Sequence, residues 1–102
     1  MFDKHQHSKE SKEFKSLSKL YINKDYVFLI ANGKNLFDEK LMEFLQIDHE
    51  HFPCVRYVFY DENKLILRKY KTKINEVLNF ITINKFIEAV SSGNYFEYFN
   101  NH

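Results

Sequence analysis

The only proline of the chain marks a place where a strand can begin. Proline cannot donate a hydrogen bond to a neighbouring strand, so a sheet accepts it only at the first residue of a strand or on an edge. Pro53 is followed, up to Tyr60, mainly by β-branched and aromatic residues, which favour a strand. It is preceded by a polar loop at 48–51 and by apolar residues at helical spacing in 37–45, with Asn35 as a suitable N-cap. This stretch therefore predicts a helix, a short loop and a strand in close succession.

Apolar spacing and turn residues predict further elements on both sides of this stretch. Phe14, Leu17 and Tyr21 share one face of a helix that begins at Ser8. The other predicted elements are a buried strand at 26–31, a hairpin of strands 53–60 and 65–70 across the turn 61–64, and a helix capped by Thr82 and ended at Gly93. We expect residues 1–7 to be a disordered N-terminus, 8–98 to form one domain and 99–102 to be a tail.

The composition excludes several classes of protein. The chain has 102 residues, of which 44% are hydrophobic and 28% charged, as in a single globular domain. Its net charge of +1 gives no general electrostatic reason to expect nucleic acid or a membrane as a partner. The lysines of the first helix are interleaved with Glu10 and Glu13, which is typical of a solvated helix face. No apolar run approaches the ~18 residues that a membrane-spanning helix requires.

Few residues offer chemistry. Cys54 is the only cysteine and follows the proline at the start of a buried strand, so we expect an inert core thiol and no internal disulfide. The histidine pairs His5/His7 and His49/His51 have a spacing that a metal can use, but no third ligand accompanies them. We therefore expect solvated loops, no metal and no cofactor, although His49 and His51 can still form a small pH-sensitive spot.

The order and spacing of several short motifs resemble a known family. The motifs are Phe52-Pro53-Cys54-Val55-Arg56, the turn 61–64, the strand 65–70 and the helix from Thr82 to Gly93. Together they look like the second half of a thioredoxin-fold domain, and most of all like the non-catalytic b and b′ domains of protein disulfide isomerases. The likeness covers residues 8–98 and marks Pro53 as the structural cis-proline.

The resemblance implies an α/β fold that is thioredoxin-like but incomplete. The elements run α-β-α-β-β-α with a mixed three-strand sheet, and the N-terminal β-α-β of the family is missing. The missing part includes the central strand, after which catalytic members carry their Cys-x-x-Cys. The resemblance therefore implies no catalytic residue in this chain. The unpaired edge of strand 26–31 also makes self-association possible.

The resemblance implies binding of unfolded or apolar polypeptide, or of an adjacent thioredoxin-like domain, during protein folding. Phe44 and Leu45 match an apolar pair that helps to line a peptide pocket in b′ domains, and Phe52, before the proline, is a further candidate. Phe44 and Leu45 can equally be ordinary core residues.

Two other functional interpretations stay open. The chain can be a fragment of a thiol–disulfide oxidoreductase whose Cys-x-x-Cys lies outside it, or a cytosolic thioredoxin-like adaptor. We expect the endoplasmic reticulum lumen if the chain is part of a longer secretory protein. We expect the cytoplasm otherwise, since it carries neither a signal peptide nor a retention tail.

Overall fold

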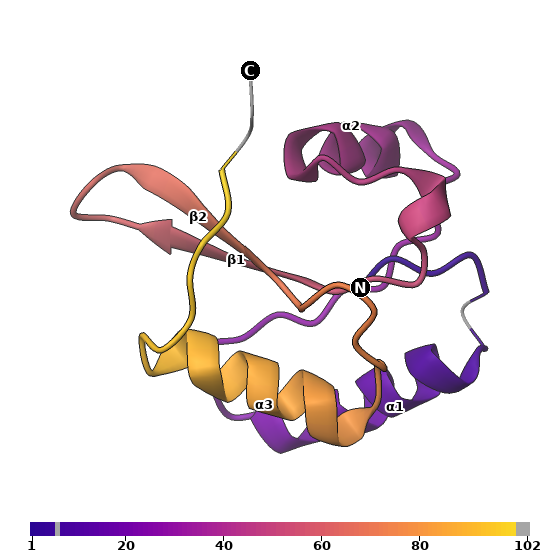
Figure 1. Ribbon diagram of the computed structural model, residues 1–102, viewed down its shortest axis with the longest axis horizontal. Coiled ribbons are helices and arrows are strands. Elements are labelled where there is room, and N and C mark those ends of the chain that lie inside the picture. The colour runs from indigo at the N-terminus through magenta and orange to yellow at the C-terminus, as the bar shows by residue number, and fades with distance from the viewer. Residues whose placement is uncertain (6, 100–102) are drawn as a thin grey trace.

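The chain folds into a mixed α/β structure, seen in a computed structural model that describes residues 1–5 and 7–99 (Figure 1). The described residues form three α-helices, two short 3-10 turns and one two-stranded antiparallel sheet. The elements are α1 (Lys9–Ser18), η1 (Lys19–Tyr21), α2 (Leu36–Leu45), η2 (His49–His51), β1 (Arg56–Asp61), β2 (Ile66–Lys71) and α3 (Phe80–Ser91).

Side-chain caps explain where the helices begin. Ser8 accepts a hydrogen bond from the backbone of Ser11 at the start of α1, and Asn35 accepts one from Asp38 at the start of α2. Both starting points are as the sequence predicts. The predicted cap of α3 is wrong, because Asn79 is the N-cap and Thr82 reciprocates from the third helical position.

Helix α2 presents a different apolar face from the predicted one. Met42 and Leu45 are buried, whereas Phe37 is 70% exposed. The buried apolar residues lie in the second half of the helix and pack in the core that contains Phe2 and Ile47. The helix ends at Gln46, whose φ of 56° is left-handed.

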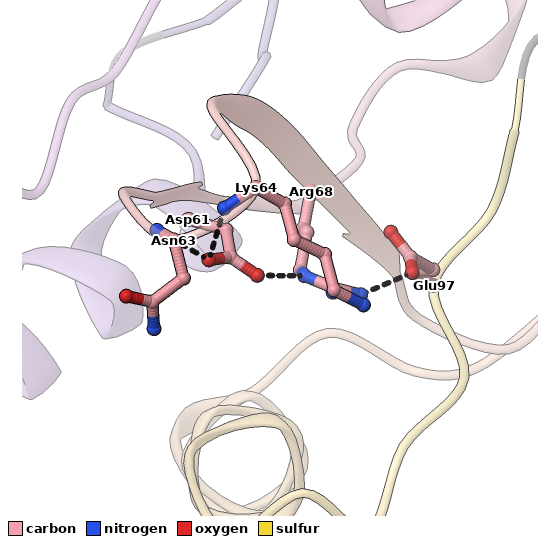
Figure 2. Close-up of polar contacts among 5 residues, drawn as sticks. All are labelled: Asp61, Asn63, Lys64, Arg68 and Glu97. Atoms are coloured by element: carbon pink, nitrogen blue, oxygen red, sulfur yellow. Dashed lines mark hydrogen bonds and ion pairs between the residues drawn. The ribbon is translucent and has the colours of Figure 1, made fainter.

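The β1–β2 hairpin is closed by a carboxylate at its turn (Figure 2). Asp61 Oδ1 accepts from the backbone nitrogens of Asn63 at 3.0 Å and Lys64 at 3.2 Å. Asp61 Oδ2 accepts from Arg68 Nε at 3.0 Å, and the hydrogen bonds from Arg68 lower the pKa of Asp61. Arg68 also contacts Glu97 Oε1 at 2.5 Å, which joins the C-terminal segment to β2. The predicted hairpin and its turn are confirmed.

The first residues of the chain form part of the sheet layer, and the expectation of disorder is wrong for them. Met1, Phe2 and Asp3 are 7%, 3% and 4% exposed. Phe2 bridges Ala31 in parallel and Cys54 in antiparallel orientation. The ring of Phe2 is buried against α2 and the loop that follows it, and this contact holds residues 1–3 in place. The polar residues next to Phe2 are the reason why the sequence suggests disorder.

The predicted three-strand sheet is not formed, because Phe2 stands between residue 31 and residue 54. Residues 26–30 alternate between partly buried and exposed, as expected of an extended segment, but only Ala31 makes a bridge. The layer therefore runs in the order 26–31, 1–3, β1, β2. Residues 1–3 thus lie between segment 26–31 and the start of β1.

Helices cover both faces of this layer, with α1 and α3 on one side and α2 on the other (Figure 1). The larger core lies with α1 and α3 and contains Leu17 and Ile83, both fully buried. The smaller core lies under α2 around Phe2 and Leu45. Because α2 is short, it leaves part of its face of the layer open.

Candidate functional site

A cleft of about 460 Å³ separates the extended segment 25–28 from β1. Its walls are residues 25–28 on one side and 55–59 on the other, and its floor is made by Phe14, Phe86 and Ile87. We call this feature the inter-strand cleft. The floor residues belong to α1 and α3 and are each about 5% exposed or less, so they are held rigidly by the larger core.

The cleft begins where the pairing by residues 1–3 stops. Phe2 joins the two walls at one end, because it bridges Ala31 and Cys54 at the same time. Beyond that point no backbone hydrogen bond joins 26–30 to β1 in the described chain. Figure 1 places the N-terminus where segment 26–31 and the start of β1 come together.

The β1 wall presents unused backbone groups to the cleft. Phe2 N donates to Cys54 O at 2.9 Å, and Cys54 N donates to Phe2 O at 3.0 Å. Along a strand, alternate residues direct their N–H and C=O groups to the same side. Arg56 and Val58 therefore direct theirs into the cleft, while Tyr57 and Phe59 direct theirs to β2.

The opposite wall follows the same alternation. Ala31 N donates to Met1 O at 2.9 Å, and Met1 N donates to Leu29 O at 2.7 Å. Val27 has the same parity, so its N–H and C=O also point into the cleft. Its backbone makes no hydrogen bond within the described residues.

Apolar side chains surround the opening of the cleft. Val27 is 83% exposed, Leu29 61%, Val58 43% and Phe59 50%. Among the lining residues only Asp25 and Arg56 are charged. Exposed apolar side chains beside a cleft are typical of a site that binds another apolar chain.

The three residues proposed from sequence for peptide binding lie outside the cleft lining. Leu45 is 2% exposed and packs in the smaller core, as an ordinary core residue does. Phe44 is 37% exposed, and its ring lies 4.8 Å from Lys69 Nζ. Phe52 contacts the rings of Phe2 at 5.7 Å and His49 at 5.1 Å. Their role in peptide binding stays a prediction.

Side chains near Phe44 donate hydrogen bonds to the last carbonyl groups of α2. Lys69 Nζ donates to Phe44 O at 3.3 Å, and Tyr98 Oη donates to Leu45 O at 3.0 Å. Burial lowers the pKa of Lys69, which is 7% exposed. Cations near the last carbonyl groups of a helix are favourable. This buried lysine is missed by sequence reasoning, because Lys69 sits in a run of basic strand residues and carries no distinguishing signal.

The thiol of Cys54 has the surroundings of an inert core residue. Cys54 is 7% exposed, and burial raises its pKa although Arg56 acts in the opposite direction. The Phe52–Pro53 peptide bond that precedes it is cis. A thiolate is the reactive form, so a buried thiol with a raised pKa exchanges slowly.

The polar groups that follow residues 1–3 organise the start of α1. The Asp3 carboxylate accepts hydrogen bonds from the Ser8 hydroxyl, from Ser11 Oγ at 2.8 Å and from His5 N at 3.1 Å. Burial acts to raise the pKa of Asp3, but these hydrogen bonds outweigh it and the pKa is lowered. Asp3 therefore has a structural role as an anchor of this loop.

Among the described residues, His5, His7, His49 and His51 are exposed, and the last two belong to η2. His51 Nδ1 accepts from Asp48 N at 3.0 Å and thereby completes the cap of η2. Across residues 1–5 and 7–99, no group of three His, Cys, Asp or Glu side chains is placed to hold a metal ion. None of the helices in the same residues is long and apolar enough to cross a membrane.

No protein-family model, no curated protein and no solved structure matches the chain.

Proposed function

We propose that this chain is a thioredoxin-like domain without thiol–disulfide chemistry, similar to the non-catalytic domains of protein disulfide isomerases, and that it binds unfolded polypeptide. The order of the layer supports this fold assignment. In the thioredoxin fold a central strand lies between the strand matched by 26–31 and the hairpin, and residues 1–3 lie at that position here. The placement of α2 opposite α1 and α3 agrees with the same fold.

The absence of disulfide chemistry is supported by the residues after this short strand. Catalytic thioredoxin-like domains carry their Cys-x-x-Cys there, whereas this chain has the sequence Lys4-His5-Gln6-His7-Ser8. The one thiol, Cys54, is buried. Exchange cycles need an accessible thiolate and normally a second thiol.

The observation that carries the binding function is the inter-strand cleft. It has an apolar floor, exposed apolar walls and only two charged lining residues, Asp25 and Arg56. Binding there would come from desolvation of apolar side chains, with weak sequence preference. Partners of this kind are unfolded polypeptides or a neighbouring domain, as expected in a folding compartment such as the endoplasmic reticulum lumen.

The test is a titration of a fluorescein-labelled unfolded peptide, followed by fluorescence anisotropy. We expect micromolar affinity at best for this small open site. The substitution V27D places a charge on the cleft wall and should weaken binding at least fivefold. The matched control is V77D, because Val77 is a similarly exposed valine (71%) outside the cleft, whereas Val27 is 83% exposed.

Circular dichroism of both variants separates lost binding from lost structure. The proposal is wrong if the parent chain does not bind the peptide. It is also wrong if V27D stays folded and binds as well as V77D.

A further inference from the structure

We propose that the bound polypeptide completes the sheet: it enters the inter-strand cleft as a strand and hydrogen-bonds to segment 26–31 and to β1 at the same time. This inference rests on the proposed polypeptide-binding function and adds the binding mode. Addition of a strand to the edge of a sheet is a common way to bind peptides. Here the strand would enter the middle of the layer, between two walls.

Residues 1–3 show the hydrogen bonds that such a strand would make. Phe2 exchanges both of its backbone hydrogen bonds with Cys54, on the β1 side. Its neighbours bond the other wall, since Met1 O accepts from Ala31 N and Asp3 N donates to Ala31 O, each at 2.9 Å. Successive residues thus alternate between the two walls, and each wall continues past Met1 with free groups of the right parity.

The geometry also sets the direction of the bound strand. Phe2 is parallel to Ala31 and antiparallel to Cys54. A strand that continues this pairing has its amino end near Tyr26 and Phe59 and its carboxyl end near Met1. The β1 wall spans residues 55–59, so about five peptide residues fill the cleft at strand spacing.

Side-chain preference follows from the same alternation. The side chain of Met1 lies in the larger core and that of Phe2 in the smaller one. Peptide residues with the parity of Met1 therefore face the apolar floor at Phe86 and should be apolar. Residues with the parity of Phe2 point to the side where Val27 and Val58 are exposed, so polar side chains are tolerated there.

A strand fits this cleft better than the other possible occupants. A small apolar ligand would cover the backbone groups of Val27, Arg56 and Val58 without hydrogen-bonding them, which is costly. A second copy would have to donate an extended segment, yet its own residues 26–31 form a wall and its C-terminal segment is hydrogen-bonded to β2 through Tyr98 N and Lys69 O at 2.9 Å. An unfolded polypeptide has extended segments available.

The experiment uses the unchanged protein and a seven-residue peptide of alternating threonine and valine, blocked at both ends. Two modified peptides carry N-methyl groups on two central valines or on two central threonines. In the proposed complex the valines face the floor and their N–H groups donate to segment 26–31, whereas the N–H groups of the threonines donate to β1. Each modified peptide therefore lacks the hydrogen-bond donors for one of the two walls. A third peptide, N-methylated on a terminal threonine, is the matched control.

We expect each centrally modified peptide to bind about tenfold more weakly than the parent peptide, and the terminal control to bind equally well. A nitroxide on the amino end of the peptide should broaden the nuclear resonances of Phe59 more than those of Phe2, and one on the carboxyl end should do the reverse.

The possible failures are distinguishable. If the parent peptide does not bind, the proposed function and the strand mode both fail. If it binds but N-methylation of the valines, the threonines or both has no effect, polypeptide binding stands and insertion between two walls is wrong. If the chain dimerises and dimerisation abolishes peptide binding, a second copy occupies the cleft and the inferred occupant is wrong.

Discussion

The two halves of the sheet layer differ in how fully their backbone is paired. In the hairpin, six residues of β1 are in register with six of β2, and Asp61 and Arg68 fasten the turn. In the other half, Phe2 alone bridges segment 26–31 and the start of β1. The hairpin half has little capacity to accept another chain, whereas the half with the cleft offers free groups on both walls. The proposed binding site therefore lies in the half of the layer whose pairing is incomplete.

Loss of the buried Phe2 side chain, which packs in the smaller core beside the two bridges, should have the largest effect on stability. We expect F2A to lower the free energy of unfolding by about 3–5 kcal/mol, because a buried Phe is lost and the smaller core is left with a cavity. Phe2 is 3% exposed, and F59A at a 50% exposed site of the hairpin is the control, expected to cost much less. Urea unfolding followed by circular dichroism measures both. Equal losses in the two variants would contradict the account.

Leu45 and Phe44, which are adjacent at the end of α2, should differ in their contribution to stability. L45A should destabilise the chain by about 2–5 kcal/mol, whereas F44A should cost about 1 kcal/mol or less. The reason is that Leu45 is 2% exposed and Phe44 is 37% exposed. If the cleft is the binding site, F44A should also leave peptide affinity unchanged. A fivefold loss of affinity in a folded F44A chain would move the site to the end of α2.

The anchor at Asp3 gives a smaller effect with a defined pH dependence. Its folded pKa lies below the ordinary value of 3.8, so its contribution to stability is present above that pH and is lost as the pH falls through the folded pKa. We expect D3N to cost about 1 kcal/mol at pH 7, through weaker hydrogen bonds with Ser8 and Ser11. The difference between D3N and the parent should shrink below about pH 4 in thermal unfolding. A difference that grows at acid pH would reverse the assigned sign.

Local patterns were enough to predict the hairpin and most of the helical faces. Pro53 and the turn at 61–64 are short-range signals. The buried residues of α3, which are Ile83, Phe86, Ile87 and Val90, have the spacing of one helical face. The role of residues 1–3 could not be predicted in this way. Phe2 is a lone ring among polar residues, and its partners Ala31 and Cys54 are distant in sequence.

The cleft was missed for a related physical reason. The cleft forms because segment 26–31 and β1 are both joined to the short segment 1–3. Such pairing between residues distant in sequence leaves no local sequence pattern. The continuous apolar run at 26–31 predicted burial on both faces, yet Val27 and Leu29 are exposed and lie outside the core under α2. The apolar run at 26–31 is the one sequence signal of the cleft, and it becomes informative only when the structure shows that part of the run is exposed.

Amide hydrogen exchange along β1 tests whether the backbone groups that face the cleft are unpaired in the free chain and become paired when a peptide binds. In the free chain we expect the amides of Arg56 and Val58, which face the cleft, to exchange quickly, and those of Tyr57 and Phe59, which face β2, to exchange slowly. Saturating threonine–valine peptide should slow exchange at Arg56, Val58 and Val27 by at least tenfold and change Tyr57 and Phe59 little. Slow exchange at Val58 in the free chain, or none of these changes with the peptide bound, would contradict the account.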